Sequence, residues 1–225
     1  MELLSAANRV SERPVYRLLA SSVLGLLLLT ARAAWTGSTS YGFLVWNLFL
    51  AWLPLVFSEI IERLAARGAR APWLLAVGAA WLLFLPNAPY LVTDFIHLRY
   101  QTLAPLWFDA VMLMAFAWTG LALGVASLRQ TARVVRQRFG RWAGAAFVAG
   151  AAALSGYGIY LGRFVRLNSW DVVTRPLHAA SEVLAPLAHP LTLQRAWTVT
   201  GALGLLFLVA YLTLHPEPRE TKPTH

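Results

Sequence analysis

The sequence predicts an all-α, polytopic membrane protein: a bundle of about six transmembrane helices with both termini in the cytoplasm. Of its 225 residues, 58% are hydrophobic and only 13% are charged, whereas about a quarter of an average soluble domain is charged. The apolar residues form long uncharged runs, and arginines gather between the runs. A chain of this length cannot bury so much apolar surface in one soluble core. The composition therefore excludes a typical soluble enzyme, a disordered chain and a coiled coil.

Charged residues lie at or near the ends of each predicted span. The uncharged runs lie between Arg17 and Arg32, Arg32 and Glu59, Arg70 and Asp94, Asp109 and Arg129, Arg141 and Arg163, and Arg195 and Glu217. A crossing helix needs about 20 mostly apolar residues, and backbone groups must be paired within hydrocarbon, which favours helices. The predicted spans are Leu18–Ala34, Tyr41–Ser58, a span within Ala71–Thr93, Leu106–Leu128, Trp142–Gly162 and Ala196–Leu214.

The first span has an alternative interpretation as a cleaved signal peptide. It has a basic start, a short apolar core and the small-residue sequence Ala31-Arg32-Ala33, which is similar to a cleavage site. An arginine inside such a site is unusual, and the next span follows at once, so a retained helix is favoured. Cleavage would leave five spans in the same orientation.

The basic residues predict the orientation. Thirteen of the 19 flank the spans on the side of the N-terminus, and six lie on the other side. Because cytoplasmic loops carry the excess of Lys and Arg, both termini should be cytoplasmic. Residues 1–215 should form one membrane-embedded domain, and 216–225 a disordered polar tail. The arginines at span ends favour membrane lipids, not nucleic acid, as partners.

Polar residues gather toward the outer ends of the third, fourth and fifth predicted spans. Intramembrane ionisable groups are costly and are functional candidates, so we predict one outward-facing polar pocket. Within Leu85-Pro86-Asn87-Ala88-Pro89-Tyr90, the two prolines should break the helix, and Asn87 and Tyr90 would bind substrate. The alternative is a plain end of the third span, with Asn87 as a local cap.

Asp94 and His97 follow this segment. On a helix they would share one face, and could form an acid–base pair or bind a metal. Asp109 opens the next span and could join them, so these three residues are the candidate catalytic groups. A third metal ligand is missing, and the metal and cofactor stay unknown. The alternative is Asp94 as a helix cap and His97 as an interfacial histidine.

Arg163 and Arg166 are three residues apart at the outer end of the fifth span. A guanidinium group suits phosphate or carboxylate, so both are candidate anion-binding residues. The alternative is pairing with Asp94, Asp109 or Asp171 inside the protein. Asn168 and Asp171 complete the candidate substrate-binding set, although Asn168 through Asp171 also resembles the start of a short external helix. Glycines 156, 158 and 162 favour close helix packing.

Three strings together resemble a known family: Trp46-Asn47-Leu48-Phe49-Leu50-Ala51-Trp52, Leu85 through Asp94 and His97, and Gly162 through Asp171. The chain is similar, from about Tyr41 to Leu214, to the uncharacterised bacterial integral membrane proteins called domain of unknown function thirteen-sixty-one. The resemblance implies a multi-pass protein of the bacterial cytoplasmic membrane. It implies no reaction and no catalytic residues.

Three functions stay open at this point. The leading hypothesis is a pocket for an anionic, phosphate-bearing lipid or lipid-linked substrate, with or without chemistry on it. The second is a small-solute or ion-coupled transporter, which also uses broken helices and buried acids. The third is a non-catalytic subunit that contacts another membrane protein. No phosphate-binding loop, zinc-protease motif or serine-hydrolase motif occurs in the sequence.

Overall fold

Six helical segments are long and apolar enough to cross a membrane, which confirms the predicted number of spans. The computed structural model describes residues 2–100, 103–167, 169–188 and 190–214, and its regular elements are helices throughout these ranges. The six segments are Val15–Thr36, Phe43–Ala66, Ala71–Leu98, Leu106–Phe139, Arg141–Val165 and Gln194–Leu214. The chain is therefore a multi-pass membrane protein.

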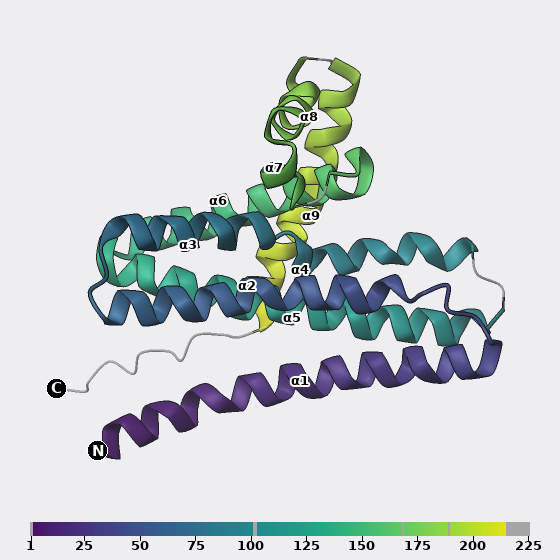
Figure 1. The fold of residues 1–225 in the computed structure, drawn as a ribbon, viewed down its shortest axis with the longest axis horizontal. Helices are drawn as coiled ribbons and strands as arrows, with labels where there is room; N and C mark the ends of the chain where they lie inside the picture. Colours follow the sequence, from purple (N-terminus) through teal and green to yellow (C-terminus); the bar gives the residue numbers. More distant parts are fainter. Residues whose placement is uncertain (1, 101–102, 168, 189, 215–225) are drawn as a thin grey trace.

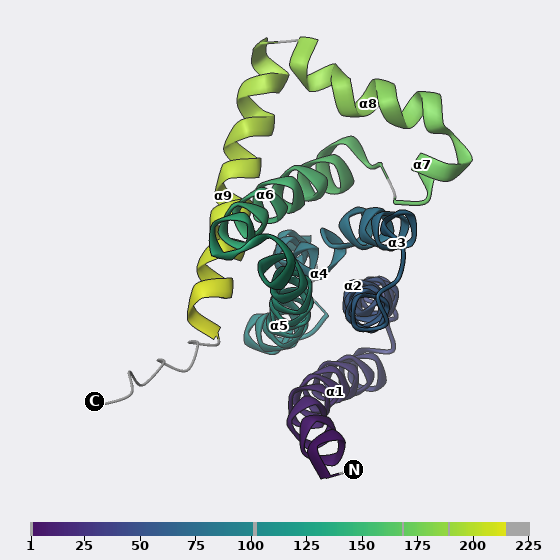
Figure 2. The same ribbon diagram turned by 90° about the vertical axis from the view of Figure 1, so that its left-hand side faces the viewer.

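The bundle is organised around the long helix α5 (Leu106–Phe139), which packs against most of the other long helices. The helices α1 (Glu2–Thr36), α2 (Phe43–Ala66), α3 (Ala71–Phe84) and α6 (Arg141–Tyr160) run along the same general direction as α5 (Figure 1). The last helix, α9 (Pro190–Leu214), instead runs across them and packs against α6 (Figure 2).

The third span is broken where the prolines predicted a break. Helix α3 ends at Phe84, the single turn α4 covers Asn87–Tyr90, and the 3₁₀ helix η1 covers Leu91–Tyr100. Two glycines allow this segment to lie close to its neighbours. A Cβ atom at Gly120 of α5 would lie 2.3 Å from the carbonyl oxygen of Ala88, and one at Gly158 of α6 would lie 2.4 Å from Cγ of Pro86.

The arginine-rich segment between the fourth and fifth predicted spans is helical along most of its length. Helix α5 continues to Phe139, and the chain turns only at Gly140, whose φ is +89°. Arginine and glutamine are good helix formers, so the helix extends past the apolar run. Arg133 on this extension binds Glu62 of α2 at 3.0 Å, and Glu59 and Arg63 within α2 bind each other at 3.0 Å.

The long connection after the fifth span contains short helices. Helix α6 continues as the π-helical turn η2 (Leu161–Val165), followed by α7 (Asp171–Thr174) and α8 (Pro176–Ala188). The predicted close packing of Gly156 is also present, since a Cβ atom there would lie 2.4 Å from the carbonyl oxygen of Thr200 in α9. The predicted disordered tail, 216–225, lies outside the described residues.

Candidate functional site

Arg163 is the centre of a polar cluster beside the broken span. Its Nη2 donates to Oδ1 of Asp94, its Nε donates to Oγ1 of Thr93 at 2.9 Å, and its Nη1 donates to Nε2 of His97 at 3.2 Å. The second carboxylate oxygen of Asp94 accepts a hydrogen bond from Nδ2 of Asn47 at 3.1 Å. The guanidinium carbon also lies 4.3 Å from the ring centre of Tyr90.

Two unusual helical turns bring these groups together. Thr93, Asp94 and His97 lie on η1, a 3₁₀ helix, in which side chains three residues apart eclipse one another. Asp94 and His97 therefore both reach Arg163, and the predicted shared face is confirmed. Arg163 itself lies in the π turn η2, and single π turns are frequent at functional sites.

Arg163 and Arg166 do not share one helical face, although a spacing of three residues would place them on one face of a continuous helix. The helix ends at Val165, and Arg166 adopts a left-handed conformation with φ +67°. The carbonyl oxygen of Leu161 accepts the backbone N–H of Leu167 at 3.1 Å and thereby closes this turn. Arg163 points into the protein with 13% of its side chain exposed, whereas Arg166 is exposed to the surroundings.

Asp109 belongs to a second ion pair and not to the Arg163 cluster. Arg32 binds it with two parallel hydrogen bonds, Nε to Oδ1 at 2.7 Å and Nη2 to Oδ2 at 3.2 Å. Both residues are completely buried. The prediction placed Arg32 at the outer end of the first span but missed this pairing, because the contact forms only when α1 packs against α5.

Tyr41 connects the two ion pairs. The guanidinium carbon of Arg32 lies 4.5 Å from the centre of the Tyr41 ring, and the Tyr41 hydroxyl donates to the backbone carbonyl of His97 at 3.3 Å. Burial raises the pKa of the Tyr41 phenol, the charge of Asp109 raises it further, and Arg32 partly opposes both effects. The phenol therefore stays protonated at neutral pH and remains a donor.

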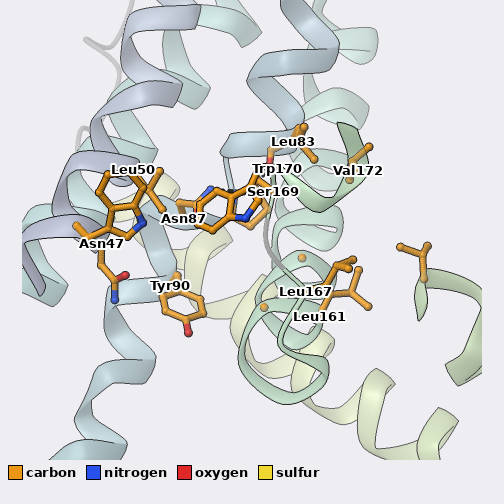
Figure 3. Close-up of a pocket in the computed structure, with 15 residues that line it drawn as sticks. Asn47, Leu50, Leu83, Asn87, Tyr90, Leu161, Leu167, Ser169, Trp170 and Val172 are labelled. Carbon is orange, nitrogen blue, oxygen red and sulfur yellow. Dashed lines mark hydrogen bonds between the residues drawn. The ribbon is translucent and has the colours of Figure 1, made fainter. Parts of the chain in front are cut away.

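A pocket of about 250 Å³ lies next to the Arg163 cluster, between α2, the broken third span, the end of α6 and the segment that follows it (Figure 3). Its polar lining consists of Asn47, Asn87, Tyr90 and Ser169, and the indoles of Trp46 and Trp170 also line it. Among the described residues, those that line this pocket include no charged side chain. Asn47 and Tyr90 line the pocket and also contact the cluster, since Asn47 donates to Asp94 and Tyr90 lies against the guanidinium group of Arg163.

The break in the third span supplies part of the pocket wall. Prolines at 86 and 89 disturb the helical hydrogen bonds, and side chains pair with nearby backbone carbonyls. Asn87 Nδ2 donates to the carbonyl of Phe84 at 3.0 Å and to Ser169 Oγ at 3.2 Å, and Ser169 Oγ donates to the carbonyl of Leu83 at 3.3 Å. Asn87 is thus both the local cap of the alternative interpretation and a pocket residue.

The structure brings together only part of the predicted site. Asn87 and Tyr90 line the pocket, and Asp94, His97 and Arg163 lie behind it. Asp171 begins α7 and is half-buried, while Asn168 lies outside the described residues. The prediction missed Ser169, Trp46 and Trp170 as pocket residues. Tryptophans near span ends are typical of the membrane interface, and only the fold of the connection places these two at the pocket.

Among the residues that the structure describes, Asp94 and His97 have no third metal ligand beside them. Within the described ranges, no group of three His, Cys, Asp or Glu side chains is arranged to hold a metal ion. Both oxygens of Asp94 are already bound, one by Arg163 and one by Asn47. In this arrangement Asp94 joins Arg163 to Asn47, and Asn47 lines the pocket.

Comparison with known proteins identifies a family without an assigned activity. The family model described as "Protein of unknown function (DUF1361)" matches residues 46–210, which is well over half of the chain and extends from the first turn of α2 through most of α9. The match covers the residues that line the pocket. No curated protein and no solved structure matches the chain.

Proposed function

Since the chain belongs to the DUF1361 family of proteins of unknown function, we propose a function from its own geometry: the pocket binds the head group of a phosphate-bearing lipid or lipid-linked intermediate. The observation that carries the proposal is the two-sided lining of the pocket. Leu50, Leu83, Leu161 and Val183 form apolar walls, and the amides of Asn47 and Asn87 lie among them. Such a combination of apolar walls and few polar groups is typical of ligand sites.

Neutral groups would recognise the uncharged polar part of the head group. Asn47, Asn87 and Ser169 offer donors and acceptors, and the rings of Trp46 and Trp170, 6.2 Å apart, offer flat apolar surfaces. Arg163 is already bound to Asp94, so it would support the wall and not hold the ligand. Arg166 is exposed, and its neighbour Leu167 lines the pocket, so Arg166 is the proposed phosphate ligand.

The charge distribution supports an outward-facing pocket. Asn47 lies near the start of α2, whereas Arg63, Arg67 and Arg70 lie at or beyond its last turn. By the positive-inside rule the arginine-rich end is cytoplasmic, and the pocket would therefore open toward the outer leaflet. Binding of this kind needs no acid–base work from Asp94, His97 or Asp109.

Titration of purified protein with farnesyl phosphate and with farnesol tests the proposal. Arg166→Gln should weaken binding of farnesyl phosphate about tenfold, because a charge-assisted hydrogen bond contributes about 1.5–3 kcal/mol, and should leave farnesol binding unchanged. Trp170→Ala should weaken binding of both compounds. Arg175→Gln and Trp118→Ala remove exposed side chains that do not line the pocket and are the matched controls.

Two results would contradict the proposal. One is wild-type protein that binds neither compound. The other is an equal loss of farnesyl phosphate binding in Arg166→Gln and Arg175→Gln, because a general charge effect would then explain it.

A carrier is the second candidate function, and the broken third span that lines the pocket favours it. Deeper in the bundle, however, the polar side chains of Trp81 and Ser127 bind each other at 2.7 Å, and those of Ser58 and Gln130 at 2.5 Å. These pairs fill the bundle and do not extend the pocket. Solute flux into proteoliposomes would favour the carrier, and ligand binding without flux would favour the proposed function.

The buried ion pairs favour the third candidate, a subunit that acts through contacts with another membrane protein. Asp94 and Asp109 are both bound to arginines, as a purely structural role requires. A pocket that binds neither test compound, in a protein that co-purifies with a fixed partner, would support this alternative.

A further inference from the structure

A second hollow lies at the opposite, arginine-rich end of the bundle. It has a volume of about 470 Å³ and is formed by α5, α6 and the last turns of α9. Three arginines, Arg129, Arg136 and Arg141, line it together with apolar side chains. Within the described part of the chain, no acidic residue lines this hollow. We call it the arginine groove.

The arginine groove has a fixed wall and two exposed cations. Arg129 Nη2 donates to the backbone carbonyl of Tyr211 at 2.7 Å, and its guanidinium carbon lies 4.9 Å from the centre of the Tyr211 ring. These contacts join α5 to α9. Arg136 and Arg141 are exposed, and the guanidinium carbon of Arg141 lies 4.8 Å from the Trp142 ring.

The remaining lining is apolar. It consists of Ala132, Ala145, Val148, Leu208 and Leu212, which lie within segments long and apolar enough to cross the membrane. Gly144 has no side chain and so allows α6 to pass close to Arg136, since a Cβ atom at Gly144 would lie 3.0 Å from Cβ of Arg136. The groove therefore presents cations beside an apolar surface at one end of the spans, where a lipid places its head group and chains.

We propose that the arginine groove is a binding site for an anionic glycerophospholipid of the adjacent leaflet, with the phosphodiester held by Arg136 and Arg141 and the acyl chains against the apolar lining. Charge complementarity carries this choice of occupant, because cationic pockets between membrane helices bind anionic head groups. Arginine also matches phosphate oxygens in geometry as well as charge. The site is separate from the pocket of the proposed function and does not depend on it.

Native mass spectrometry of the full chain, released from detergent micelles, tests the proposal. The added probes are phosphatidylglycerol and phosphatidylcholine with identical acyl chains. The wild-type chain should retain one more molecule of phosphatidylglycerol than of phosphatidylcholine. The double variant Arg136→Gln/Arg141→Gln should bind phosphatidylglycerol at least tenfold more weakly, since each arginine near the membrane surface contributes about fivefold.

Matched variants separate the groove from general surface charge. Arg67→Gln/Arg70→Gln removes the same charge from two exposed arginines outside the groove and should bind phosphatidylglycerol as the wild type does. Ala145→Phe fills the apolar part of the groove without changing any charge and should also reduce binding. This variant keeps the test decisive if the double arginine variant fails to fold.

The same spectra contain the results that would overturn the proposal. These are equal retention of the two lipids, equal losses in the two double arginine variants, full binding by Ala145→Phe, or a dimer without lipid. A lipid-free dimer would assign the groove to a second copy of the chain.

Discussion

At the scale of single residues, the two buried arginine–aspartate pairs determine how the polar side of the bundle is arranged. Each pair joins segments distant in sequence, Arg32 with Asp109 and Arg163 with Asp94. In the described structure Nη1 of Arg32 is buried without a hydrogen-bond partner, and the guanidinium carbon lies 4.5 Å from the centre of the Tyr41 ring. Buried ion pairs often add little net stability, yet removal of one partner is strongly destabilising.

This asymmetry predicts the behaviour of variants at Arg32 and Asp109. Asp109→Asn should destabilise the protein by about 3–5 kcal/mol, because it leaves a buried arginine uncompensated. The double variant Arg32→Met/Asp109→Leu should regain most of the lost stability, since no buried charge remains. Thermal unfolding in detergent measures both effects.

The exposed pair Glu59–Arg63 supplies the control for this prediction. The Arg63 side chain is 70% exposed, so Glu59→Gln should change stability by less than about 1 kcal/mol. If Arg32→Met/Asp109→Leu is as unstable as Asp109→Asn, the prediction is contradicted, because the loss of stability would then come from lost packing and not from an unpaired charge.

The sequence identified the polar residues and offered the pairing of Arg163 with Asp94 as an alternative to anion binding, but it missed the pairing of Arg32 with Asp109. Asp94, His97 and Arg163 were predicted as functional residues, and they do lie together. Asp109 was grouped with them because both sites lie at the outer ends of spans. The pairing of Asp109 with Arg32 depends on which face of α1 meets α5, and that face cannot be read from nearly uniform apolar runs.

At the scale of elements, the broken third span and the end of α6 form one unit. Its position depends on two glycines, Gly120 and Gly158, that lie against Ala88 and Pro86. The two prolines made the break predictable. The π turn η2 was not predictable, because a π turn is an exception within a helix and has no composition of its own. The pocket lies where these two irregular elements meet.

Substitution of Gly158 tests the role of this contact. Gly158→Ala should destabilise the protein by about 1–3 kcal/mol, as overpacking does, because the new Cβ would lie 2.4 Å from Cγ of Pro86, part of a constrained ring. It should also weaken ligand binding in the pocket, since Gly158 and Pro86 both line it. Thermal unfolding and the farnesyl phosphate titration measure the two effects.

Gly150 on the same helix is the matched control. A Cβ atom there would meet nothing within 4 Å. Gly150→Ala should therefore be neutral or stabilise the helix by up to about 1 kcal/mol, because alanine favours helix more than glycine does. Equal losses of stability in the two variants would show that α6 needs glycine for a reason other than contact with Pro86.

At the scale of the whole molecule, the spans and their number follow from composition, but the packing of the sixth span does not. The prediction placed Ala196–Leu214 as one more crossing helix, and α9 is long and apolar enough for that. In the structure α9 runs across the other long helices (Figures 1 and 2). Gly156 of α6 and Gly204 of α9 meet closely at this crossing. Small residues on both helices permit such an approach, but sequence spacing does not fix the direction of crossing.

The absence of cysteine makes the orientation directly testable, because each introduced cysteine is then the only thiol in the chain. With both termini cytoplasmic, Thr39→Cys and His178→Cys should react with a membrane-impermeant maleimide added to intact cells. Arg67→Cys and Thr221→Cys should react only after permeabilisation. Thr39, Arg67 and His178 are all exposed, so burial would not prevent labelling.

If α9 does not cross the membrane, Thr221→Cys should instead react in intact cells, as His178→Cys does. A fully reversed pattern would place the pocket in the cytoplasmic leaflet and the arginine groove in the outer one, and the proposed lipids would have to be sought on those sides.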